Sequence, residues 1–74
     1  MVRATRVTND IRALRTSCGI TQADLAARVG VTRQTIIAIE QGRYSPSLEM
    51  AFQIARALDA RLDEVFGYPD TPER

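Results

Sequence analysis

The side chains with the most suggestive chemistry in this sequence are Arg33 and Gln34, which stand next to each other. An arginine guanidinium matches the two acceptors on the major-groove edge of guanine, and a glutamine amide matches the donor and acceptor of adenine. Together at the start of a helix, the two would suit direct reading of DNA bases. Without further context, the pair is explained better as ordinary helix-forming surface residues.

The 74 residues give little indication of catalysis, metal binding or membrane insertion. The sequence has no histidine and a single cysteine, Cys18, so it offers neither the usual zinc ligands nor an internal disulfide. Glu40 as a general acid or base would lack a histidine or a second convergent carboxylate. No apolar run reaches the length of a membrane span, and no secretory signal begins the chain. We therefore expect no catalytic residue, metal, cofactor or membrane contact, and a cytoplasmic location.

The elements that would position Arg33 and Gln34 lie in residues 21–42, which predict two short helices joined by a tight turn. The first, 22–29, begins after Thr21, whose hydroxyl can accept a hydrogen bond from an amide of the first turn. The acidic side chain of Asp24, three residues later, can accept a hydrogen bond near the same helix end. Gly30 permits the backbone conformation that turns the chain.

The second helix of this pair, 33–41, begins after Thr32 and stops at Gly42. Its Ile36 and Ile39 are expected to face the core. Two helices crossing steeply over so short a turn form a helix-turn-helix, whose second member can lie in the DNA major groove.

The rest of the chain predicts three further helices around this pair. One begins after Thr8 or Asn9 and runs to about Cys18, one spans 48–58 after a cap at Ser47, and a short one spans roughly 61–65. The apolar face of the 48–58 helix is predicted to consist of Leu48, Ala51, Phe52, Ile54, Ala55 and Leu58.

Charge is unevenly distributed although the whole chain carries only +1. Residues 1–43 hold seven arginines against three acids, a net +4, and residues 44–74 hold three arginines against six acids, a net −3. A phosphate-facing surface on the first half would explain the difference. Arginines that merely solvate helix faces explain it equally well when the charges are considered alone.

The sequence closely resembles the helix-turn-helix regulators of the Cro/CI type, also called XRE-like. The resemblance rests on 22–26 (QADLA), 29–32 (VGVT), 33–36 (RQTI) and 39–43 (IEQGR), continues through 45–47 (SPS) to Phe66, and covers roughly 9–66. It implies an all-α, five-helix lambda-repressor-like domain, with a possible small pair of N- and C-terminal strands. The expected organisation is an arm or strand at 1–8, the domain at 9–66 and a tail at 67–74.

The resemblance also assigns roles to residues. It implies base contacts at the positions of Arg33 and Gln34, and the exposed face of the 33–41 helix adds Thr32 and Ile37 as candidates. It implies a DNA-backbone contact by Gln22, and positions at the ends of the two helices add Thr21, Thr35, Gln41, Gly42, Arg43 and Tyr44. Gln22 is expected to brace Gln34, and Arg15 and Glu40 are expected to form a buried salt bridge. Ile37 departs from the polar residues usual at its position, and it suits either a thymine methyl or partial burial.

Similar short repressors form dimers through the region after the fourth helix. The resemblance implies an interface of Leu58, Leu62, Val65, Phe66 and Tyr68, with a strand at 2–7 paired to 66–68. A twofold dimer would hold two recognition helices about 34 Å apart and would fit a palindromic operator.

These observations predict a dimeric, sequence-specific regulator that binds double-stranded DNA, and they favour a repressor over an activator. Two alternatives stay open. One is the antitoxin of a toxin–antitoxin pair, which would bind its own promoter and also a partner protein. The other is a domain that serves protein interaction alone, in which Arg33 and Gln34 would tolerate substitution.

Overall fold

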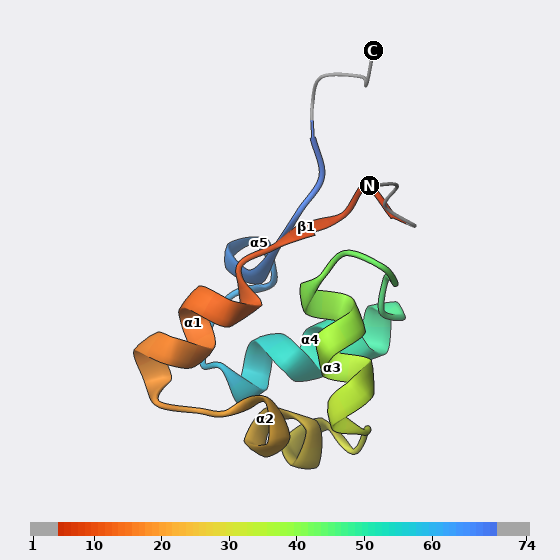
Figure 1. Ribbon diagram of the computed structural model, residues 1–74. Helices are drawn as coiled ribbons and strands as arrows, with labels where there is room; N and C mark the ends of the chain where they lie inside the picture. The colour runs from red at the N-terminus through yellow and green to blue at the C-terminus, as the bar shows by residue number, and fades with distance from the viewer. Residues whose placement is uncertain (1–4, 70–74) are drawn as a thin grey trace.

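The computed structural model describes residues 5–69, which form five helices and one strand pair (Figure 1). In chain order the elements are β1 (Thr8–Asn9), α1 (Ile11–Cys18), α2 (Gln22–Val29), α3 (Arg33–Glu40), α4 (Leu48–Ala57), α5 (Leu62–Val65) and β2 (Phe66–Gly67). The predicted all-α class with a small strand pair is confirmed. Within the described residues, no helix is long and apolar enough to cross a membrane.

Three helices begin where side-chain hydroxyls satisfy free amides. Thr21, Thr32 and Ser47 each accept a hydrogen bond from the amide three residues later, at 3.0, 3.2 and 3.1 Å. At α2 the Thr21 amide also donates to Asp24 Oδ2 at 3.1 Å, which completes a capping box. The predicted starts of α2, α3 and α4 are therefore confirmed.

The helix ends follow the predicted turns within one residue. Gly30 adopts a left-handed φ of 75° between α2 and α3, as the short connection requires. The predicted ends of α3 and α4 are each one residue too late, because Gln41 and Leu58 flank these helices rather than belong to them. After α4, Asp59 takes a left-handed φ of 54° that is uncommon for a residue with a side chain.

The start of α1 differs from the prediction. Thr8 and Asn9 lie in β1, which pairs antiparallel with β2 in the register Thr8 to Gly67 and Asn9 to Phe66. The residue that flanks α1 is Asp10, whose side chain makes no capping bond. Asn9 Oδ1 instead accepts from the Ile11 amide at 3.1 Å. Of the strand predicted at 2–7, residues 5–7 do not belong to β1, and residues 2–4 lie outside the described part of the chain.

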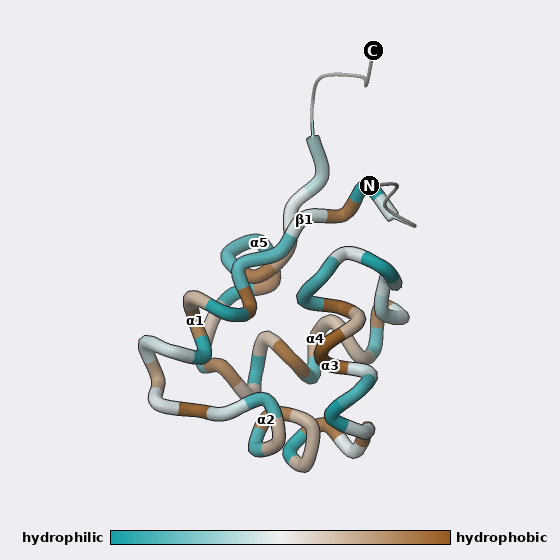
Figure 2. Tube along the Cα trace, viewed as in Figure 1, coloured by the Kyte–Doolittle hydropathy of each residue, from teal (hydrophilic) through white to brown (hydrophobic). Residues whose placement is uncertain are grey.

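The core lies between the helices and consists mostly of branched aliphatic side chains. In Figure 2, hydrophobic (brown) stretches of the trace alternate with hydrophilic (teal) ones along the helices. The largest fully buried residues are Ile11, Leu25, Ile36, Ile39, Ile54, Leu58 and Val65. The inward placement of Ile36 and Ile39 is confirmed. Two residues assigned to the apolar face of α4 are not in this core, because Leu48 is 69% exposed and Phe52 is 50% exposed.

Candidate nucleic-acid interface

The outer face of α3 carries the predicted base-reading residues. Thr32, Arg33 and Gln34 are exposed at the start of the helix, and Ile37 is half-buried one turn later. Within the described residues, neither Arg33 nor Gln34 makes a hydrogen bond or an ion pair, so both polar groups are available to a ligand. The burial of Ile36 and Ile39 fixes which side of α3 points outward.

The cap of α3 limits what the two threonines can do. Thr32 Oγ1 accepts from the Thr35 amide at 3.2 Å and lies 3.1 Å from Thr35 Oγ1. Part of the hydrogen-bonding capacity of each hydroxyl is therefore used within the helix. Thr35 is half-buried, whereas Thr32 is exposed and keeps an open side.

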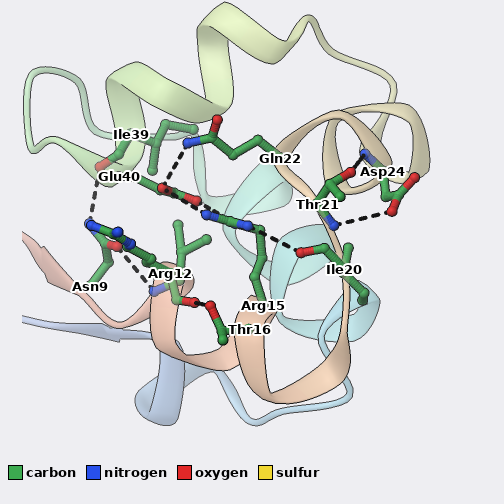
Figure 3. A network of polar contacts seen from close by, with 11 residues as sticks. Asn9, Arg12, Arg15, Thr16, Ile20, Thr21, Gln22, Asp24, Ile39 and Glu40 are labelled. Carbon is green, nitrogen blue, oxygen red and sulfur yellow. Dashed lines mark hydrogen bonds and ion pairs between the residues drawn. The ribbon is translucent and has the colours of Figure 1, made fainter.

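A polar network centred on Glu40 fixes α3 against α1 and α2 (Figure 3). Arg15 Nε donates to Glu40 Oε2 at 2.7 Å, and Arg15 Nη1 donates to the Ile20 carbonyl at 3.1 Å. The Arg15 and Glu40 side chains are only 12% and 8% exposed, so the ion pair is largely shielded from water. The structure thus forms the buried salt bridge that the resemblance implied.

Gln22 completes this network in a way that the sequence did not predict. Its Nε2 donates to Glu40 Oε1 at 3.1 Å, whereas the expectation was a bond to Gln34. A carboxylate is a stronger acceptor than a neutral amide oxygen, which explains the preference. Gln22 is half-buried and braces the far end of α3 instead of its exposed start.

The end of α3 has a second anchor that sequence reasoning missed. Asn9 Nδ2 donates to the Ile39 carbonyl at 3.0 Å, so β1 holds a residue thirty positions away. Asn9 had been singled out only as a possible cap of the first helix. The link joins the recognition helix directly to the strand pair (Figure 3).

An open hollow of about 730 Å³ lies beside α3 and the start of α2. Its lining residues are Arg12, Arg15, Thr16, Gly19, Ile20, Thr21, Gln22, Ala23, Arg33, Glu40 and Gln41. Three arginines line it against one acid, so it favours anions. Arg12 was not predicted to lie here, although its position three residues before Arg15 on one helix was a usable signal.

The residues that follow α3 divide into exposed and structural members. Gln41 and Arg43 are exposed and hydrogen-bond to each other through Oε1 and Nη2, and Tyr44 is 43% exposed. Gly42 is buried and its amide donates to the Ile39 carbonyl at 3.1 Å. Gly42 therefore has a role in the turn, and its contact with the DNA backbone stays a prediction.

The predicted dimer residues divide into a buried pair and three residues, Leu62, Phe66 and Tyr68, that line one hollow. Leu58 and Val65 are 2% and 1% exposed and belong to the core, so they cannot offer their side chains to a partner. Leu62 and Phe66 are half-buried, and Tyr68 is 63% exposed with the Arg6 guanidinium 5.4 Å from its ring centre.

The electrostatics at the start of α2 follow from the capping box. The hydrogen bond from the Thr21 amide holds the pKa of Asp24 below its ordinary value, with further help from the Thr21 hydroxyl and the Arg28 charge. The ionised carboxylate lies near the positive end of the helix. Among the described residues, no group of three or more cysteine or acidic side chains could hold a metal ion.

The fold and the bare polar face of α3 define a helix-turn-helix protein. The model of the Helix-turn-helix family HTH_3 matches residues 11–65, and the chain belongs to this family. An uncharacterized HTH-type transcriptional regulator of Methanothermobacter thermautotrophicus is 60% identical over 57 residues, which are 76% of this chain and 83% of the relative. One of Methanocaldococcus jannaschii is 47% identical over 62 residues, covering 84% and 94%.

The chain is also similar to solved structures and to an antitoxin. The restriction-modification controller protein C.AhdI from Aeromonas hydrophila superposes with a TM-score of 0.69 at 35% identity, covering 73% of this chain and 78% of that one. Antitoxin HigA1 of Mycobacterium tuberculosis is 37% identical over 70 residues, which are 95% of this chain but only 47% of the antitoxin.

Proposed function

We propose that the protein is a DNA-binding transcriptional regulator that acts as a dimer and represses by occupying a palindromic operator. The observation that carries the proposal is the outer face of α3, where Arg33 and Gln34 have no partner within the described residues. The relatives named as HTH-type transcriptional regulators support the same function. Repression is steric, because bound protein excludes polymerase from the operator.

Recognition of bases falls to the start of α3. Arg33 reads guanine and Gln34 reads adenine, each through paired hydrogen bonds in the major groove. The exposed hydroxyl of Thr32 offers its remaining hydrogen-bonding capacity to the DNA, and Ile37 packs against a thymine methyl. Because Glu40 holds α3 through Arg15 and Gln22, these side chains meet the groove in a fixed orientation.

Contacts with phosphates surround this reading surface. The hollow beside α3 brings Arg12 and Arg33 together with the first residues of α2, at the positive end of that helix, where an anion is favoured. Gln41, Arg43 and Tyr44 extend the surface beyond the other end of α3. Such contacts set the register of the protein on DNA but carry no sequence information.

An antitoxin function remains the second candidate, because the alignment with HigA1 extends over 95% of this chain. An antitoxin would use the same α3 face on its own promoter and would need a further surface for a toxin protein. The two candidates therefore share DNA binding in the cytoplasm and differ only in the partner. Neither requires a cofactor or catalysis by this chain.

Selection from a random-duplex library at physiological salt tests the proposal. Wild type, Gln34→Ala and Ser17→Ala are compared, the last as a control at an exposed α1 position whose hydroxyl makes no hydrogen bond within the described residues. Wild type and Ser17→Ala are expected to enrich one palindrome, and Gln34→Ala to lose preference at defined bases by about 10-fold or more. Failure of wild type to enrich any motif would reject sequence-specific repression.

A further inference from the structure

The exposed side of α4 leaves two large apolar side chains in water. We define this α4 face as Leu48, Glu49, Phe52, Gln53 and Arg56, all of which are exposed. Leu48 and Phe52 stand one turn apart and are 69% and 50% exposed, so they form one continuous apolar strip. Tyr44, in the preceding loop, is also exposed. Single exposed apolar residues are ordinary, but a clustered strip marks an interaction surface.

The two charges on the α4 face, Glu49 and Arg56, lie at nearly equal distances along the helix on either side of Phe52. Glu49 lies three residues before Phe52 and Arg56 lies four residues after it. Within the described part of the chain, neither charge takes part in an ion pair or a hydrogen bond. Two such helices packed antiparallel, with a twofold axis between positions 52 and 53, bring Glu49 of each chain opposite Arg56 of the other.

We propose that a second copy of this chain binds the α4 face, with the two α4 helices antiparallel and Phe52 packed against its twofold-related copy. The symmetry makes one surface complementary to itself, as a twofold interface requires. The inference rests on the proposed dimeric function and assigns its interface. It differs from the predicted interface, in which Leu58 and Val65 are buried in the core and only Leu62, Phe66 and Tyr68 retain exposed surface.

The alternative surface at the strand pair is less suited to a second copy. It is a hollow of about 520 Å³ lined by Val7, Arg61, Leu62, Asp63, Phe66, Gly67 and Tyr68. Its charges are already paired, because Arg61 Nη2 lies 3.0 Å from Asp63 Oδ2. Its most exposed ring, Tyr68, is already faced by Arg6. The α4 face has neither kind of internal partner.

The size of the α4 face sets the strength of the dimer. A helix of ten residues is about 15 Å long, so a pair of α4 helices buries less than the roughly 800 Å² per partner of a standard interface. The dimer should therefore dissociate at micromolar concentrations and be strengthened when both chains bind one DNA.

A charge-reversal cycle tests this arrangement by sedimentation equilibrium without DNA. Glu49→Arg and Arg56→Glu each place like charges opposite one another, and each should weaken the dimer about 10-fold. The double variant Glu49→Arg/Arg56→Glu restores opposite charges and should recover the wild-type dissociation constant within about threefold. Asp63→Arg is the matched control, since it reverses an exposed charge beside the strand-pair hollow and should leave the dimer unchanged.

A cross-link gives a second readout at the twofold axis. In a Cys18→Ser background, Gln53→Cys should oxidise rapidly to a disulfide-linked dimer, whereas Asp63→Cys should stay monomeric. A dimer weakened by Asp63→Arg but not by Glu49→Arg, a double variant that stays weak, or a protein that is monomeric at all concentrations would overturn the proposal. Gln34→Ala should dimerise normally, which separates failure of this interface from failure of DNA recognition.

Discussion

The outer faces of α3 and α4 are both left bare by the fold, yet they carry opposite chemistry. The face of α3 presents polar and basic side chains, Arg33 and Gln34 above all, whereas the face of α4 presents Leu48 and Phe52 between balanced charges. Polar side chains suit the hydrogen-bonding edges of bases, and an apolar strip suits another protein surface. On the proposals made above, DNA reading falls to α3 and pairing of the two chains to α4 within one small domain.

The two faces also differ in how firmly they are held. The end of α3 is fixed by the Glu40 carboxylate, which Arg15 and Gln22 engage, and by the bond from Asn9 to the Ile39 carbonyl. On α4, within the described residues, the side-chain hydrogen bonds at the two ends are the Ser47 cap and a bond from Cys18 Sγ to the Leu58 carbonyl at 3.6 Å. We infer that α3 depends on polar contacts for its orientation, while α4 depends mainly on the packing of its inner side.

The largest effect should come from breaking the network that holds α3. Glu40→Gln leaves the Arg15 charge shielded and unpaired, and it should lower the free energy of unfolding by about 3 kcal/mol. Urea denaturation measures the change. Asp63→Asn breaks an exposed ion pair and serves as the control, with an expected loss below about 0.5 kcal/mol. Equal losses in the two variants would show that the Glu40 network does not anchor the fold.

A smaller effect on stability is expected when the hydroxyl cap of α3 or of α4 is removed, and only one of the two changes should affect DNA binding. Thr32→Ala and Ser47→Ala each remove one hydroxyl cap, and each should lower the free energy of unfolding by about 1 kcal/mol. Only Thr32→Ala should also weaken binding to the selected palindrome, because Thr32 lies on the reading surface. Thermal unfolding and fluorescence anisotropy give the two numbers. If Ser47→Ala lost as much DNA affinity as Thr32→Ala, the assignment of reading to α3 would fail.

The smallest effect concerns protonation at the start of α2. Because the folded pKa of Asp24 is lowered, its contribution to stability is complete above the ordinary aspartate pKa and is lost as the pH falls through the folded pKa. Thr21→Ala removes the hydroxyl but keeps the amide, so it should raise the pKa of Asp24 only part of the way. Carboxyl-detected NMR titration follows the group. An unchanged pKa would mean that the hydroxyl does not take part.

Much of the helix-turn-helix could be predicted because its signals are local. Thr21, Thr32 and the glycine at position 30 each act within four residues of themselves, so their types and spacing suffice to place α2 and α3. The pairing of Arg15 with Glu40 is not local, and only the family resemblance supplied it.

The features that were not predicted depend on contacts between distant parts of the chain, which the periodicity of apolar residues does not reveal. Leu48 and Phe52 have the spacing of a buried face, but no described element covers them. The bond from Gln22 to Glu40 depends on how closely α2 approaches the end of α3. Asn9 lies in a two-residue strand whose partner is more than fifty positions away, and so short a strand leaves no alternation to detect.

The most direct test of the division between α3 and α4 is titration of the protein onto the selected palindrome and onto its isolated half-site, with bound chains counted by native mass spectrometry. We predict two chains on the palindrome, bound more tightly per site than one chain on the half-site. Gln34→Ala should lose affinity for both duplexes, and Glu49→Arg should lose only the advantage of the palindrome. A single chain on the palindrome, or equal loss of both duplexes by Glu49→Arg, would contradict the account.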